Sequence, residues 1–149
     1  MSARRANDTL RRMPRNLDEA LGDGGMPLLA ELGLSFRHYG EGWAEASWTP
    51  TALACNPLGT VHGGVYGVVH DAAMNFAASS ALERGDRAAT LDLSYQTIRG
   101  SQAGEPLVVR GGVVRLTGSV AYLESTVHDR DRALVSRAAG TFLVRRATP

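Results

Sequence analysis

The chain has 149 residues, of which 44% are hydrophobic and 21% are charged, and its formal net charge is +1. This length suits one domain, and the composition excludes a chain that is disordered throughout. A charge so close to neutral excludes a general nucleic-acid binder that relies on a basic surface.

The basic and cysteine residues indicate where the protein works. All 16 basic residues are arginine, a bias typical of a GC-rich bacterial genome, although guanidinium groups also suit phosphate. The single cysteine, Cys55, excludes an internal disulfide and fits a reducing compartment. No apolar run approaches the roughly 20 residues of a membrane span, so we predict a cytoplasmic protein with no membrane partner.

Residues 1–27 are predicted to form an arm, flexible or partly helical, ahead of a single domain over residues 28–149. Five arginines lie between Met1 and Arg15 with no apolar stretch behind them, so this segment is not a secretory signal. A solvated arm is favoured over a nucleic-acid contact. Glycines and Pro27 interrupt the apolar residues of Leu17–Glu31, which indicates two short helical pieces around a turn.

The spacing of apolar residues after Glu31 predicts two strands, one long helix and four further strands. Strands are predicted over Leu34–Tyr39 and Trp43–Trp48, joined as a hairpin, and an uninterrupted helix over Val65 to Leu82. Four more strands follow: Ala89–Arg99, Pro106–Leu116, Ser119–His128 and Ala133–Arg145. The predicted class is α+β, with the helix lying across a curved antiparallel sheet whose last four strands form a meander.

Asp71 is the only charged residue between Glu45 and Glu83, and it lies within the predicted helix. Apolar or small residues surround it on nearly every side, as expected of a buried helix. A buried carboxylate must be kept neutral, paired or used in chemistry. Asp71 is therefore a candidate catalytic acid, unless an arginine from a strand pairs with it.

His62-Gly63-Gly64 stands at the start of the same helix. Glycines there let a ligand approach the free amides of the first turn, and the helix dipole stabilises negative charge on an oxygen. Attack on a thioester carbonyl generates such a charge. Taken alone, the tripeptide is also compatible with a plain turn and a satisfied histidine.

The spacing of these groups predicts a dimer. Gly63 and Asp71 are eight residues apart, about 12 Å along a helix, so they can hardly meet at one carbonyl carbon within a subunit. An antiparallel copy of the helix would bring the glycine of one subunit to the aspartate of the other. We therefore expect a two-fold dimer with two sites at its interface, if both residues are catalytic.

The stretch from Asn56 to Gly64, Asn-Pro-Leu-Gly-Thr-Val-His-Gly-Gly, followed by Asp71, resembles the motif of the hotdog-fold thioesterases of the phenylacetate-pathway and thioesterase-superfamily type. The resemblance extends from about Leu28 to Arg145. It implies a hotdog fold, hydrolysis of an acyl-coenzyme A thioester to free acid and coenzyme A, and no further cofactor, since the coenzyme is part of the substrate. It also fits a homodimer that pairs into a dimer of dimers.

The resemblance also assigns roles to individual residues. Asp71 would activate water or attack the thioester, and the Gly63 amide would polarise the carbonyl. His62 would support the turn, Asn56 would form a hydrogen bond near the acid, and Thr90 would help to position water.

Six further residues are candidates for substrate binding: Gly64, Asn75, Arg99, Arg115, Gly118 and Ser119. Asn75 lies one helical turn after Asp71, where it could hold water or fill a polar gap. The turn Thr117–Ser119 lacks the basic residue that several relatives carry after the glycine. Arg99 and Arg115 are therefore the candidates for the coenzyme phosphates, with strand ends in solvent as the alternative for both.

Other interpretations remain open. His70 stands where the family has a small or apolar residue, and its effect on the carboxylate is not predicted. No metal is expected, because His62, His70 and His128 lack carboxylates or cysteines at ligand spacing. Tyr95 is assigned to the core. Hotdog domains also act as enoyl-coenzyme A hydratases or dehydratases and as non-catalytic acyl-coenzyme A sensors, and no motif specifies the acyl group.

Overall fold

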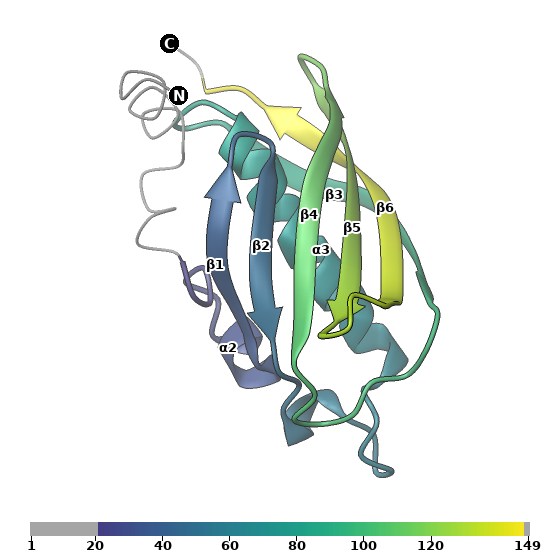
Figure 1. Cartoon of the computed structure of the whole chain (residues 1–149). Coiled ribbons are helices and arrows are strands. Elements are labelled where there is room, and N and C mark those ends of the chain that lie inside the picture. The colour runs from purple at the N-terminus through teal and green to yellow at the C-terminus, as the bar shows by residue number, and fades with distance from the viewer. Residues whose placement is uncertain (1–20, 148–149) are drawn as a thin grey trace.

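The computed structural model of the chain describes residues 21–147 and contains one curved sheet with a long helix across its inner face (Figure 1). The predicted arm over residues 1–20 lies outside the described residues. The helices are α2 (Pro27–Leu32), the 3-10 turn η1 (Ala52–Ala54) and α3 (Gly63–Ala81). The strands are β1 (Leu34–Gly40), β2 (Trp43–Trp48), β3 (Arg87–Thr97), β4 (Leu107–Leu116), β5 (Val120–Asp129) and β6 (Leu134–Arg145).

The sheet has six antiparallel strands in the order β1-β2-β4-β5-β6-β3. The predicted meander is therefore right for β4, β5 and β6 and wrong for β3, which pairs with β6 rather than β4. Short turns force consecutive strands to be neighbours, but the long link over residues 98–106 lets the chain cross to β2. This topology leaves β3 at one edge of the sheet.

The helix α3 lies against the sheet with most of its residues buried. It begins two residues earlier than predicted, because His62 caps its first turn. Gly111 on β4 lets the two layers come this close: a β-carbon there would lie 2.2 Å from the carbonyl oxygen of Ala73. The core continues through Phe36, whose ring stacks on that of Phe76 with centroids 3.8 Å apart.

The segment before α2 belongs to the folded domain rather than to the arm. Gly22 exchanges two backbone hydrogen bonds with Phe36 of β1, at 2.9 and 2.7 Å. Pro27 begins α2 and Gly33 ends it in the left-handed conformation, as the fixed φ of proline and the freedom of glycine favour. The boundary predicted at residue 28 is therefore too late, since pairing of Gly22 with a strand is a tertiary contact.

None of the helices within residues 21–147 has the length and apolar character needed to cross a membrane.

Candidate active site

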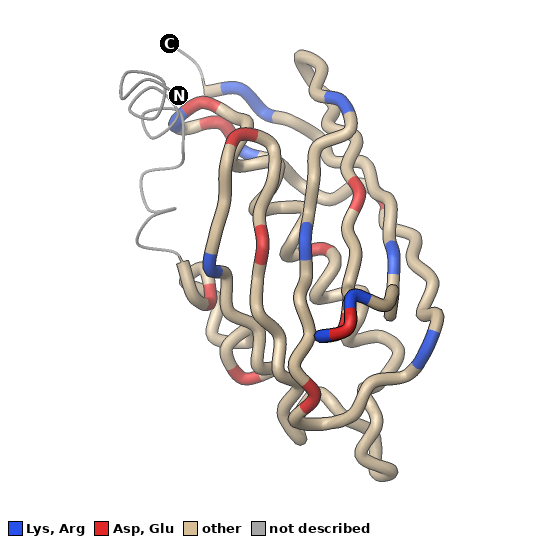
Figure 2. Tube along the Cα trace, viewed as in Figure 1, with Lys and Arg blue, Asp and Glu red and all other residues tan. Residues whose placement is uncertain are grey.

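Asp71 lies in the middle of α3 and is half-buried. It is the only charged residue of the helix, which is otherwise tan in Figure 2. The hydroxyl of Thr90 donates a hydrogen bond to Asp71 Oδ1 at 2.5 Å. Between residues 21 and 147 no arginine forms an ion pair with this carboxylate. The alternative, that Asp71 forms a structural salt bridge with an arginine, is therefore not supported within the described chain.

A β-bulge in β3 lies next to Thr90. The register with β6 shifts between Thr90 and Asp92, and the bulged residue, Leu91, is 57% exposed. Asp92 accepts a hydrogen bond from Thr141 at 2.7 Å and so belongs to a separate pair. The fold thus brings together two of the predicted site residues, Thr90 and Asp71, and the Thr90 hydroxyl holds the carboxylate in place.

Asp71 lines a cavity of about 290 Å³ between α3 and the segment that leads into α2. Asn75, one turn further along the helix, lines the same cavity, and its Nδ2 donates to the carbonyl of Ala88 at 3.2 Å. Asn75 therefore lies on the same face of the helix as Asp71. A carboxylate beside a partly open, mostly apolar pocket is a typical arrangement for a reactive acid.

The start of α3 carries the predicted amide donors. His62 Nδ1 accepts a hydrogen bond from the Gly64 N–H at 3.0 Å, so His62 supports the turn as expected. The amide of Gly64 is thereby occupied, which argues against its use in substrate binding. The Gly63 N–H has no acceptor within the described residues, and a β-carbon at Gly63 would meet nothing within 4 Å. The open donor is therefore Gly63.

The sequence predicts Tyr95 in the core, but Tyr95 lies on the exposed strand β3 and is 37% exposed. Its hydroxyl donates to the carbonyl of Gly63 at 2.9 Å. Gly67 makes room for the ring, because a β-carbon there would lie 2.9 Å from Tyr95 Cε1. Tyr95 thus ties the edge strand to the carbonyl of the residue whose N–H is open, a contact that depends on tertiary structure and has no motif in the sequence.

Asn56 shapes the loop ahead of α3. Its Nδ2 donates to Thr60 Oγ1 at 2.8 Å, and its Oδ1 accepts from the amides of Leu58 and Thr60. Within one protomer these bonds are local, so the predicted hydrogen bond near the acid is not formed there. The side chain fixes the turn that leads to His62.

His70 is fully buried and faces the sheet, away from the environment of Asp71. Its Nδ1 lies 2.9 Å from Ser125 Oγ, and its Nε2 lies 2.7 Å from Ser136 Oγ. Ser136 donates its own proton to the carbonyl of Gln96 at 3.0 Å, so Ser136 accepts from Nε2–H and Ser125 donates to Nδ1. Burial lowers the pKa of His70 from 6.5 to about 4. The neighbour of Asp71 is therefore a neutral, fully bonded structural residue.

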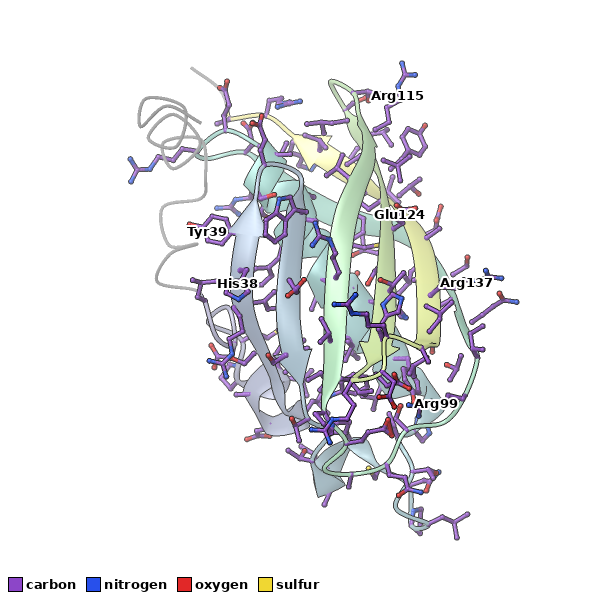
Figure 3. All side chains as sticks on the ribbon, in the orientation of Figure 1. His38, Tyr39, Arg99, Arg115, Glu124 and Arg137 are labelled. Carbon is purple, nitrogen blue, oxygen red and sulfur yellow. The ribbon has the colours of Figure 1, made fainter. Side chains whose placement is uncertain are left out.

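Arg99 and Arg115, the two candidates for the coenzyme phosphates, lie at opposite ends of the sheet (Figure 3). Arg99 forms ion pairs with Glu105 at 2.6 Å and Asp129 at 2.9 Å, and these hydrogen bonds raise the pKa of its guanidinium. Two carboxylates already balance its charge, which argues against phosphate binding by Arg99. Arg115 is exposed beside an open surface pocket and has no ion pair within the described chain.

The turn Thr117–Ser119, near Arg115, receives a basic side chain from elsewhere in the chain. Arg146 donates to the carbonyls of Thr117 and Gly118, at 3.1 and 3.2 Å, and pairs with Asp86. Ser119 does not supply a charge, but its backbone carbonyl accepts from Val144. The sequence gives no signal that Arg146 lies at this turn, because the pairing of β5 with β6 is what brings the residue there.

Comparison with known proteins identifies the family. The chain matches the model of the Thioesterase superfamily over residues 58–136, more than half of its length. The protein belongs to the thioesterase superfamily. The match includes the helix with Asp71 and the glycine pair, as the resemblance predicted. This thioesterase-superfamily chain is also 29% identical over 77 residues to an esterase candidate of Haemophilus influenzae, a match that spans 56% of that relative.

Solved structures agree on the fold of this thioesterase-superfamily protein. A thioesterase of Haemophilus influenzae is similar with a TM-score of 0.80 and 21% identity, over 92% of this chain and 95% of that one. The PaaI protein of the E. coli phenylacetic acid degradation operon is similar with a TM-score of 0.75 and 21% identity, over 83% and 88% of the two chains. The predicted hotdog fold is confirmed.

Proposed function

We propose that this protein hydrolyses an acyl-coenzyme A thioester to a free acid and coenzyme A. One observation carries the proposal: a lone helical carboxylate, held by Thr90, faces a cavity. A free amide at the start of the same helix, that of Gly63, supplies the second group that thioester hydrolysis needs.

The chemistry follows from these two groups. The Gly63 N–H donates to the thioester oxygen and stabilises the negative charge that develops when the carbonyl carbon is attacked. Asp71 removes a proton from water, whose oxygen forms the new bond to that carbon. The intermediate collapses with loss of the C–S bond, and the departing thiolate takes the proton from Asp71. Direct attack by Asp71, which forms an anhydride that water then opens, uses the same arrangement.

A shared site in a homodimer completes the proposal. Because α3 runs unbroken from Gly63 to Ala81, Gly63 and Asp71 of one protomer stay about 12 Å apart. Within the described chain, the strand β3 pairs with β6 on one side only. It exposes Leu91 and Tyr95, and Ile98 is exposed directly after its end. An edge strand with exposed apolar residues favours pairing with a second copy. That pairing would bring the two helices together in antiparallel fashion.

The choice of an acyl-coenzyme A as substrate has two supports. A protein of the same fold from Streptococcus mutans, similar with a TM-score of 0.71 and 20% identity over 78% of this chain, was crystallised bound to acetyl-coenzyme A. In this chain, Arg115 places an exposed guanidinium, with no ion pair among the described residues, at one end of the sheet, as a coenzyme phosphate requires.

The test is thiol release from a panel of acyl-coenzyme A esters. Asp71→Asn keeps the size of the side chain and should lower kcat at least about 100-fold, because the general base or nucleophile is lost. Asp131→Asn, which changes an exposed acid in the turn before β6, is the matched control and should stay near wild type. Near-normal thiol release by Asp71→Asn would contradict the proposal.

The same assay separates the two alternatives. Hydration of an enoyl-coenzyme A without free thiol would indicate a hydratase. Tight binding of acyl-coenzyme A without turnover would indicate a sensor, and neither result is expected here.

A further inference from the structure

The cavity beside Asp71 has walls from two parts of the chain that are far apart in sequence. One wall comes from α3, with Val68 and Phe76 on either side of the carboxylate. The other comes from the segment before α2 and its first turn, with Asp23, Met26 and Leu29. The segment is anchored there by the pairing of Gly22 with Phe36, so the cavity is a built feature of the protomer.

We propose that this cavity binds the acyl group of the substrate and selects neutral, apolar acyl groups of up to about ten carbon atoms, a limit set by cavity volume. The inference rests on the proposed function, which makes Asp71 the residue next to the reacting carbonyl. An acyl chain attached to that carbonyl must then lie against the surfaces that surround the carboxylate.

The volume sets the size limit. An apolar cavity of roughly 150 Å³ accommodates benzene, which corresponds to about 25 Å³ per carbon atom. The cavity measures about 290 Å³. If an attacking water takes about 30 Å³ of it, the remainder holds about ten carbons. Longer chains would have to leave the cavity and lose their apolar contacts.

The charge of the lining sets the second preference. The ionisable residues of the described lining are Asp23 and Asp71, and no basic residue is among them. A carboxylate at the far end of the acyl group would be repelled by two acids and would have no cation to pair with. Asp23 is fixed in this position by a turn in which its Oδ1 accepts from the Gly25 N–H at 2.8 Å. The cavity therefore disfavours acyl groups that end in a carboxylate.

The two walls differ in how freely they can change. Phe76 is 9% exposed and its ring is stacked on Phe36, so that wall is fixed by the core. Met26 is 49% exposed and its side chain is unbranched, so that wall can be altered without disturbing the core. Met26 is therefore the position at which substrate length can be tested by substitution.

The experiment measures kcat/KM for straight-chain acyl-coenzyme A esters from two to sixteen carbons. Wild type should rise to a maximum at about eight to ten carbons and fall at least about tenfold by sixteen, as the volume limit requires. Met26→Trp should fill the cavity and lower kcat/KM at eight to ten carbons about tenfold relative to four carbons. Val108→Trp, on the exposed outer face of β4, should leave the profile unchanged. Melting curves confirm that each variant is folded.

A second comparison tests the charge. Succinyl-coenzyme A differs from butyryl-coenzyme A by its terminal carboxylate at the same chain length. Asp23→Asn keeps the turn with Gly25 and should raise the succinyl-to-butyryl ratio of kcat/KM about tenfold. An unchanged ratio would overturn the proposed charge preference.

The outcomes for the inference and for the proposed function are distinct. Active wild type whose chain-length profile is the same in Met26→Trp and Val108→Trp overturns the acyl-site assignment and leaves hydrolysis in place. Wild type that releases no thiol from any ester overturns the proposed function, and this inference fails with it.

Discussion

His70 and Asp71 are neighbours on α3, yet the two sides of the helix on which they lie differ in every respect. The side of His70 faces the sheet, where each ring nitrogen has a serine partner and no solvent reaches it. The side of Asp71 faces the cavity, where the carboxylate has one hydroxyl donor and open space. Successive residues on a helix are rotated by about 100°, so His70 and Asp71 point in different directions. The hydrogen-bonding groups of His70 are all occupied, whereas the carboxylate of Asp71 can still accept hydrogen bonds and is available for chemistry.

Substitution of His70, on the side of the helix that faces the sheet, should have the larger effect on stability. His70→Leu removes the acceptor and donor that satisfy Ser125 and Ser136, and leaves both hydroxyls buried. The free energy of unfolding should fall by about 3 kcal/mol in denaturant titration, with activity per folded molecule largely retained. A variant as stable as wild type would contradict the assigned network.

The same residue predicts a pH dependence. The folded-state pKa of His70 is lowered to about 4 from 6.5, so the unfolded chain binds more protons between these values. The free energy of unfolding should therefore fall as the pH is lowered from 6.5 to 4, by up to about 1.4 kcal/mol per pH unit from this group. The exposed His38 serves as the control, since His38→Gln should keep the slope. A slope unchanged in His70→Gln would contradict this account.

Substitution of Thr90, next to the cavity side of the helix, should have a smaller effect, and this effect should be on catalysis only. Thr90→Val removes the hydroxyl that holds Asp71 while it keeps the β-branched shape that β3 favours. We expect kcat to fall about tenfold with little change in KM or Tm, because only the orientation of the carboxylate is lost. Thr90→Ser should restore most of the rate. A loss confined to Tm would mean that Thr90 is structural.

The smallest expected effect concerns the two arginines. Arg115→Ala should raise KM for acyl-coenzyme A a few-fold, and more at low than at high salt, because one exposed phosphate contact is removed. Arg99→Ala should lower Tm and leave KM unchanged, since Arg99 is already paired with Glu105 and Asp129. The reverse pattern would place the coenzyme at the other end of the sheet.

What the sequence could predict depends on whether a feature arises from local pattern or from contacts between distant segments. The helix and all six strands follow from local periodicity, and the pair Gly63 and Asp71 follows from a motif with a physical reason for its spacing. The position of β3, the hydrogen bond from Tyr95 to Gly63 and the cavity wall at Met26 depend on pairings between distant segments. His70 could be noticed as unusual, but its serine partners lie 55 and 66 residues away.

The most direct test of the central proposal uses two inactive variants together. Gly63→Pro removes one N–H while it preserves the helix start, because proline suits the first helical position and His62 before it is extended. Alone, this variant should lose about 100-fold or more in kcat, like Asp71→Asn.

When the two variants are unfolded together and refolded as an equal mixture, half of the dimers should contain one of each. Each mixed dimer has one site with an intact Gly63 from one protomer and an intact Asp71 from the other, so about a quarter of wild-type activity should return. A mixture no more active than its components, although mixed dimers form, would contradict a site shared between protomers.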